Sequence, residues 1–165
     1  MRILGIDPGL AETGYGIIEQ RNDTFSAVEF GVITTSSKAD TGARLKKIYE
    51  EAMEIIDKFN PDVAAIEDIF FSSNAKSAIQ VAQTKGVIIL ACVNSGLDVF
   101  EYTPLQVKMA VVGYGKAPKE QMQKMVKALL KLPDTPQSDH SADALAVAIC
   151  YSNREKMDRI LKSSQ

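Results

Sequence analysis

The sequence predicts an α/β protein with a mixed five-stranded sheet flanked by helices. Residues 2–35 hold three strand-like segments separated by short turns, residues 41–59 show the spacing of an amphipathic helix, and residues 60–68 follow with a short apolar run. An antiparallel meander followed by a β-α-β unit and further helices is typical of an α/β fold with a mixed sheet. At 165 residues, the chain is expected to form a single domain, residues 1–165.

The first three strands are predicted from alternation and turn signals. In residues 2–7, RILGID, Asp7 shares one face with Ile3, because successive side chains of a strand point to opposite faces. The second and third strands are predicted at residues 15–20 and 24–35, with the turn-prone sequence RND between them. Short connections of this kind join antiparallel neighbours, so the three strands should form a meander.

The pattern changes to helical spacing at residues 41–59. Its apolar residues recur three or four positions apart: Leu45, Ile48, Tyr49, Ala52, Ile55, Ile56 and Phe59. Residues 60–68, NPDVAAIED, are expected to form a buried fourth strand parallel to the first, because a helix crosses over between the two. A second helix at about residues 74–93 and a fifth strand at 97–102 complete the predicted sheet.

The last third of the chain is predicted to be mainly helical. Residues 104–113 form one helix, Pro118 opens another, and a third helix contains His140, the only histidine. Cys92 and Cys150 lie in apolar helical runs, where buried thiols are expected rather than a disulfide or metal ligands.

Composition excludes several classes of protein. Hydrophobic residues make up 45% of the chain and charged residues 24%, which is ordinary for a globular protein and unlike a disordered one. No segment approaches the roughly 18 apolar residues of a membrane span, and the N-terminus lacks the apolar stretch of a signal peptide. We therefore expect a cytoplasmic protein that has no membrane partner.

Charge is unevenly distributed along the chain. The net charge is −2, yet residues 104–131 carry six lysines and a single acid, Glu120. These lysines are Lys108, Lys116, Lys119, Lys124, Lys127 and Lys131. Such a cationic flank is either a solvated face or a surface that binds nucleic-acid phosphates.

Two acidic side chains are expected to meet at one edge of the sheet. Asp7 ends the first strand, directly before the turn-forming sequence PGLAETG, and Glu67 ends the fourth strand. If these strands are parallel neighbours, the two carboxylates lie side by side at the carboxyl edge, where open α/β sheets bind ligands.

A helix packed against that edge would bring further ligands. In SDHSADALA, residues 138–146, His140 and Asp143 project from one helix face, and Asp139 and Asp143 do so equally. Carboxylates and an imidazole gathered in one place repel one another unless cations neutralise them. Mg²⁺ prefers carboxylate oxygens, an imidazole also suits Mn²⁺, and two such ions about 4 Å apart suit phosphodiester hydrolysis.

Each candidate also has a purely structural interpretation. Asp7 before Pro-Gly could shape a turn, Asp139 could cap the last helix, and His140 could be an ordinary half-buried residue. Phe70 could belong to the core, although on an exposed loop it could stack on an unpaired base. The hypothesis of a catalytic site fails only if every one of these structural interpretations is correct at the same time.

Four blocks of sequence carry a family resemblance: GIDPGLAETGYGI, AIEDIFF, QVKMAVVGYGKAPKEQMQKMV and SDHSADALAVAI. In order and spacing they resemble the RuvC family of bacterial Holliday-junction resolvases over nearly the whole chain. The resemblance implies an RNase H-like fold and a metal-dependent, structure-selective endodeoxyribonuclease of DNA recombination and repair. It also implies a homodimer that makes symmetric paired nicks in opposed strands of a four-way DNA junction.

The same resemblance assigns roles to single residues. Asp7, Glu67 and Asp143 match the catalytic acids, and His140 matches the fourth ligand of two Mg²⁺ ions per subunit, which Mn²⁺ should replace. Asp139 is the alternative fourth ligand, because it shares the helix face with Asp143. The DNA-binding residues implied are Phe70, which would stack on a junction base, and Lys108, Lys116 and Lys119.

Two partners follow from the resemblance. The helix at about residues 74–93 is similar to the helix through which the family dimerises; it carries Ala78, Val81, Ala82 and Gly86. A branch-migration motor is the second expected partner.

Three alternatives stay open at this level. GIDPGLAETG also resembles the phosphate-binding loop of actin-like ATPases, although no second phosphate loop follows. Small RNase H-fold proteins of ribosomal RNA maturation are related, but they lack the lysine block and the late His-Ser-Ala-Asp helix. A nucleic-acid-binding module without catalysis would not need Asp7, Glu67 and Asp143.

Overall fold

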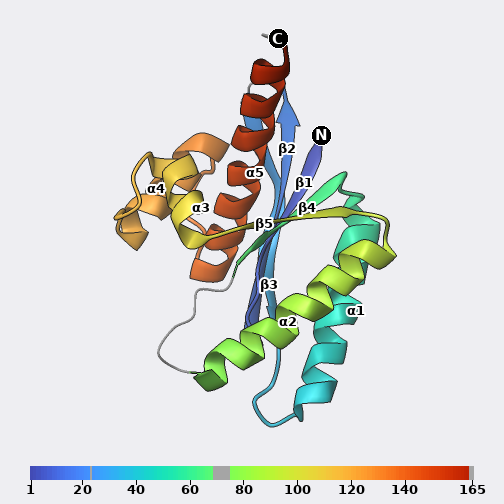
Figure 1. Ribbon diagram of the computed structural model, residues 1–165. Helices are drawn as coiled ribbons and strands as arrows, with labels where there is room; N and C mark the ends of the chain where they lie inside the picture. The colour runs from blue at the N-terminus through green and yellow to red at the C-terminus, as the bar shows by residue number, and fades with distance from the viewer. Residues whose placement is uncertain (23, 69–74, 164–165) are drawn as a thin grey trace.

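The computed structural model describes residues 1–22, 24–68 and 75–163, and its elements follow one another in the predicted order (Figure 1). The strands are β1 (Arg2–Asp7), β2 (Glu12–Arg21), β3 (Thr24–Thr34), β4 (Val63–Glu67) and β5 (Asp98–Tyr102). The helices are α1 (Thr41–Phe59), α2 (Ala75–Asn94), α3 (Pro104–Val112), α4 (Lys119–Leu130) and α5 (Asp139–Ser163). The predicted α/β class with a mixed five-stranded sheet is confirmed.

The strands form one sheet in the order β3-β2-β1-β4-β5. β1, β2 and β3 pair antiparallel as a meander, whereas β1 with β4 and β4 with β5 are parallel. The predicted parallel pairing of the first and fourth strands is therefore confirmed, with α1 as the crossover. Because β1 and β4 are central neighbours, their carboxyl ends emerge together at one edge.

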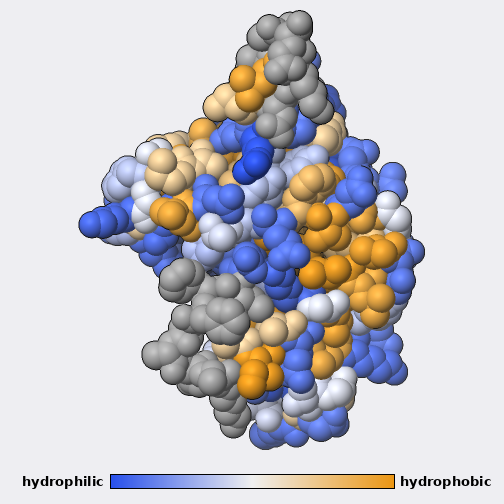
Figure 2. Space-filling view, in the orientation of Figure 1, coloured by the Kyte–Doolittle hydropathy of each residue, from blue (hydrophilic) through white to orange (hydrophobic). Residues whose placement is uncertain are grey.

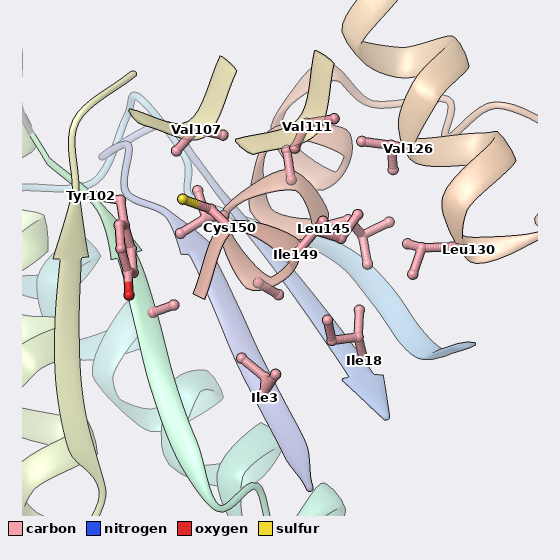
Figure 3. Packing of buried hydrophobic residues seen from close by; sticks show 14 of the residues in the cluster. Ile3, Ile18, Tyr102, Val107, Val111, Val126, Leu130, Leu145, Ile149 and Cys150 are labelled. Atoms are coloured by element: carbon pink, nitrogen blue, oxygen red, sulfur yellow. The ribbon is translucent and has the colours of Figure 1, made fainter. Parts of the chain in front are cut away.

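Helices cover both faces of the sheet (Figure 1). α3, α4 and α5 lie on one face, and α1 and α2 lie on the other. A hydrophobic core lies between the sheet and each helix layer. Figure 3 shows the core on the α5 side, in which Leu145 and Ile149 of α5 pack over Ile3 of β1 and Ile18 of β2. Side chains of β1 alternate between the layers, so Asp7 lies on the α5 side of the sheet, as Ile3 does.

Local signals in the sequence fix the helix ends. The carboxylate of Asp40 accepts a hydrogen bond from the Ala43 N–H and caps the start of α1, and Asn60 ends α1 in the left-handed conformation at φ 45°. Thr103 and Gln106 form a capping box at the start of α3. Pro118 stands at the N-cap of α4, one residue before the helix it was predicted to open.

Both cysteine side chains lie in the interior of the protein. Cys92 and Cys150 are free and buried, as predicted, and burial raises the pKa of their thiols to about 12 and about 11. In the part of the chain that the structure describes, no helix has the length and apolar character needed to cross a membrane.

Helix α5 lies directly on the sheet because β1 and β2 carry glycine where it crosses. A Cβ added to Gly5 would lie 2.0 Å from the carbonyl oxygen of Ala144, and one added to Gly14 would lie 2.0 Å from that of His140. Gly14 pairs with Asp7 in the β1–β2 register. The close approach therefore places the first turn of α5 beside the end of β1.

Replacing Gly14 with alanine is expected to destabilise the protein by about 1–3 kcal/mol, the usual cost of forcing an extra methyl group into a packed layer. Urea denaturation followed by circular dichroism measures the change. The matched control is Gly42→Ala near the start of α1, where the nearest atom to an added Cβ is a side-chain oxygen of Asp40 at 3.2 Å. Alanine there should leave stability unchanged or raise it by up to about 1 kcal/mol. Equal midpoints for the Gly14 variant and the wild type would contradict the close packing of α5.

Candidate active site

Two strand ends and one helix supply the acidic side chains of the site. Asp7 ends β1 and Glu67 ends β4, and the register pairs Ile6 with Ile66 directly before them. Asp143 lies on the first part of α5, which packs across the same face of the sheet. Besides burial, the nearby carboxylate of Asp7 raises the pKa of Glu67 by repulsion, so the predicted neighbourhood of the two strand-end acids is present.

His140 completes this group from the first turn of α5. Its Nδ1 lies 2.7 Å from Oδ2 of Asp7, and its Nε2 lies 3.6 Å from Oε2 of Glu12. Glu12 begins β2, and sequence reasoning gave it no role. The signal that could have found it is the turn PGLAETG, which returns the chain to the sheet edge five residues after Asp7.

The electrostatics of the site are those of crowded carboxylates. Burial raises the pKa of Glu67 to about 8, and repulsion by Asp7 and Asp143 acts in the same direction. Burial also raises the pKa of Asp143, although the nearby ammonium group of Lys119 acts to lower it. The hydrogen bond to Asp7 raises the pKa of His140. Such a cluster favours a bound proton or cation, because each added positive charge relieves the repulsion.

Lys119 lies among the acids. Its Nζ is 3.0 Å from Oδ2 of Asp139 and 3.5 Å from Oδ2 of Asp143. Lys108 is half-buried and lines, with Lys119, Glu67 and Asp143, a cavity of about 200 Å³. Both lysines therefore reach the acidic cluster from α3 and α4, where either a phosphate or the carboxylates can be contacted.

The remaining predicted DNA-binding residues are placed differently. Lys116 is exposed on the segment between α3 and α4, outside the cavity that Lys108 and Lys119 line. Phe70, predicted to stack on a base, lies outside the residues that the structure describes.

The structure separates the two candidates for the fourth ligand. His140 faces Asp7, whereas the carboxylate of Asp139 is half-exposed, pairs with Lys119 and accepts a hydrogen bond from Nε2 of Gln123 at 2.6 Å. The pKa of Asp139 is lowered by its hydrogen bond to Lys119. Asp139 is the first residue of α5, so the capping position lies before it.

The donor set fits a hard divalent cation. Three carboxylates and one imidazole, from Asp7, Glu67, Asp143 and His140, are ligands that suit Mg²⁺ and Mn²⁺. As they stand, His140 is engaged with Asp7 and Asp143 with Lys119. Within residues 1–22, 24–68 and 75–163, no three histidine, cysteine, aspartate or glutamate side chains are gathered closely enough to hold an ion.

A wide cleft opens beside the acids. It has a volume of about 770 Å³, and Asp7, Glu67 and His140 line one side of it. Arg44 of α1 and Gln80 of α2 line other parts of its wall. Its size falls within the roughly 300–1,000 Å³ of ligand-binding clefts, so the acids face a space that a substrate can enter.

The fold and the site together define an RNase H-like nuclease, in which acids at adjacent strand ends and on a helix across them suit phosphodiester hydrolysis. The family model described as crossover junction endodeoxyribonuclease RuvC matches residues 3–151. The chain belongs to the RuvC family.

Known proteins support this assignment over almost the full chain. A crossover junction endodeoxyribonuclease RuvC of Caldanaerobacter subterraneus subsp. tengcongensis is 50% identical over 95% of this chain and 95% of the relative. One from Caldicellulosiruptor saccharolyticus is 53% identical over 92% of both chains. The solved structure of T. thermophilus RuvC in complex with Holliday junction substrate has a TM-score of 0.92 at 31% identity and covers 96% of each chain.

Proposed function

We propose that this chain is a structure-selective endonuclease that resolves four-way DNA junctions by paired nicks in opposed strands, in recombination and repair. The observation that carries the proposal is the gathering of Asp7, Glu67, His140 and Asp143 at one sheet edge, where the first three line an open cleft and Asp143 lines the adjoining cavity with Glu67. The RuvC family supports it, because T. thermophilus RuvC, which is similar over 96% of the chain, is described in complex with Holliday junction substrate. The family assignment also speaks against the ATPase and ribosomal RNA alternatives.

The four clustered side chains are the proposed ligands of two Mg²⁺ ions per subunit, for which Mn²⁺ should substitute. When bound, such ions lower the pKa of a coordinated water and stabilise the charge that develops on phosphate oxygens. Asp7 and Glu67 supply carboxylates from rigid strand ends, and α5 supplies Asp143 and His140. Lys119 offsets the negative charge around Asp143 and lies where an incoming phosphate would be met.

DNA contacts are proposed for the cationic flank. Lys108 and Lys119 line the cavity next to Glu67, so they are placed to bind phosphates close to the acids. Lys116 is exposed on the adjoining segment and would contact the backbone farther from the acids. The stacking role of Phe70 rests on the sequence resemblance alone.

The exposed face of α2 supports a homodimer. Ile79, Leu90 and Val93 are 61%, 53% and 58% exposed, and Figure 2 shows hydrophobic residues gathered along this helix. Ala82 and Gly86 share this exposed face, whereas Ala78 and Val81 are half-buried and line the cleft beside the acids. Contiguous apolar patches of this kind mark interaction surfaces, and a two-fold dimer offers two equivalent sites for two opposed strands.

A supercoiled plasmid with an extruded cruciform tests both the activity and the dimer. Two nicks within one bound complex give linear DNA, whereas single independent nicks give open circles. The wild type is expected to give mainly linear product in Mg²⁺, and Leu90→Glu should be monomeric in analytical ultracentrifugation and lose most of that product. The control is Leu161→Glu, which changes a leucine of similar exposure, 59%, on α5. Open circles from a dimeric wild type would contradict paired cleavage.

Residues 1–165 would act as a single nuclease domain in the cytoplasm, where chromosomal junctions form, together with a branch-migration motor that delivers them. Support for the motor comes only from the family resemblance.

A further inference from the structure

Lys85 of α2 is a buried charge outside the acidic cluster. Among the charged residues that the structure describes, it alone is buried, with 9% of its surface exposed. Its Nζ donates a hydrogen bond to Oδ1 of Asp68 and forms an ion pair with Oε2 of Glu101. Burying an ammonium group is costly unless the group is paired and hydrogen-bonded. The buried charge of Lys85 therefore depends on the two carboxylates that the ends of β4 and β5 supply.

These two carboxylates lie at the carboxyl edge of the sheet. Asp68 directly follows Glu67, and its N–H donates to the carbonyl oxygen of Tyr102 at 2.8 Å, which extends the ladder between β4 and β5. Glu101 pairs in register with Ile66. Lys85 therefore ties together the ends of β4 and β5 at the residue after Glu67.

The contacts of Lys85 with Asp68 and Glu101 lie on the face of the sheet opposite to the side chain of Glu67. Ile66 packs in the layer of α1 and α2, whereas Tyr102 packs in the layer of α5. Since successive strand residues alternate between faces, Glu67 projects toward α5, and Asp68 and Glu101 project toward α2. Lys85 thus holds the backbone beside Glu67. Lys85 itself lines neither the cleft nor the cavity beside the acids, although its partner Asp68 lines the cleft.

We propose that Lys85 is a positioning residue for Glu67 that couples the orientation of this carboxylate to helix α2. The inference rests on the proposed nuclease function, in which Glu67 is a metal ligand. Without the lysine, no contact from α2 would hold the end of β4 beside the end of β5, so the backbone next to Glu67 would be less firmly placed. Because α2 also carries the exposed apolar face proposed for the dimer, the same helix links that interface to one ligand of the site.

The test compares variants that separate positioning from folding. Lys85→Met leaves the carboxylates of Asp68 and Glu101 without the cation between them and can fail to fold. The triple variant Lys85→Met, Asp68→Asn, Glu101→Gln removes these charges while keeping similar side-chain volumes. Lys85→Arg keeps the positive charge and can still donate to both carboxylates, so it serves as the conservative variant that should restore activity. Lys46→Met on the exposed surface of α1 is the control for loss of one lysine.

Three quantities decide the outcome: the single-turnover rate of junction cleavage at saturating enzyme, the Kd for the junction in EDTA, and the affinity for Mn²⁺ measured by EPR without DNA. For the triple variant we expect the rate to fall about 10–100-fold and Mn²⁺ affinity to weaken about tenfold, as for other groups that orient metal ligands. The melting temperature should stay close to that of the wild type, and the junction Kd should not weaken, because Asp68→Asn only removes a negative charge from the cleft wall. Lys85→Arg should recover most of the rate.

Other outcomes have distinct meanings. Cleavage and Mn²⁺ affinity at wild-type values in a folded triple variant would overturn the inference, as would a change confined to the junction Kd. A wild type that binds Mn²⁺ but cleaves no junction would overturn the proposed function instead, and the Mn²⁺ affinities would still decide whether Lys85 positions Glu67.

Discussion

Replacing Asp7 or Asp143 with asparagine, or Glu67 with glutamine, is expected to abolish junction cleavage and leave junction binding intact. Each change keeps the size of the side chain and removes one charged oxygen donor from the acidic cluster. Loss of one interaction that stabilises charge in the transition state costs about 10²–10³-fold in rate, and loss of a metal ligand should cost at least as much. The lysines of α3 and α4 are untouched, so affinity in EDTA should be unchanged or higher.

The measurement is a single-turnover cleavage time course beside a gel-shift titration for each variant. Asp134→Asn is the control, because Asp134 is exposed on the segment between α4 and α5 and lines neither the cleft nor the cavity beside the acids. The same series decides between the two candidates for the fourth ligand. The cleavage rate of His140→Ala should be as low as those of the acid variants, whereas Asp139→Asn should retain a much higher rate. Loss of binding together with cleavage would contradict the assignment of the acids to catalysis.

Lys119→Met should lower both the cleavage rate and the salt dependence of junction binding. The variant removes a cation that lies 3.5 Å from Asp143 and lines the cavity beside Glu67. Loss of one phosphate contact lowers the slope of log affinity against log salt by about one, and loss of one electrostatic contact near the reacting phosphate costs about 10²-fold in rate.

Lys124→Met is the matched control for Lys119. Lys124 belongs to the same helix but pairs with Glu120 at 2.6 Å on the exposed surface. Both variants change the net charge equally, so any difference between them reflects position. An unchanged salt-dependence slope with slower cleavage would mean that Lys119 acts on the acidic cluster and does not contact a DNA phosphate. No change in the slope or in the rate would mean that Lys119 is an ordinary solvated lysine.

The sequence predicted the elements and the faces on which the acids lie. Apolar spacing predicted a helix at residues 41–59, and the structure confirms both ends, with Asp40 capping the start and Asn60 ending the helix. The crossover of α1 made β1 and β4 parallel neighbours, and this alone brought Asp7 beside Glu67. The i and i+3 spacing then placed His140 and Asp143 on one side of α5.

Contacts between side chains of different elements could not be predicted in the same way. Periodicity tells which face a residue occupies but not which residue it meets there, so the approach of Lys119 to Asp139 and of Glu12 to His140 needed the packed structure. The same limit applied to Lys85, which looked like an ordinary helical lysine. Gly14 was another case, since only the position of α5 shows why a side chain cannot fit there.

The most direct test of the central claim is cleavage of a synthetic mobile four-way junction, compared with a linear duplex of the same sequence, in Mg²⁺, in Mn²⁺ and in EDTA. We expect paired nicks in two opposed strands of the junction with either metal, no cleavage of the duplex, and no cleavage in EDTA. Junction binding without cleavage under any of these metals, or equal cutting of junction and duplex, would contradict the account of this chain as a metal-dependent junction resolvase.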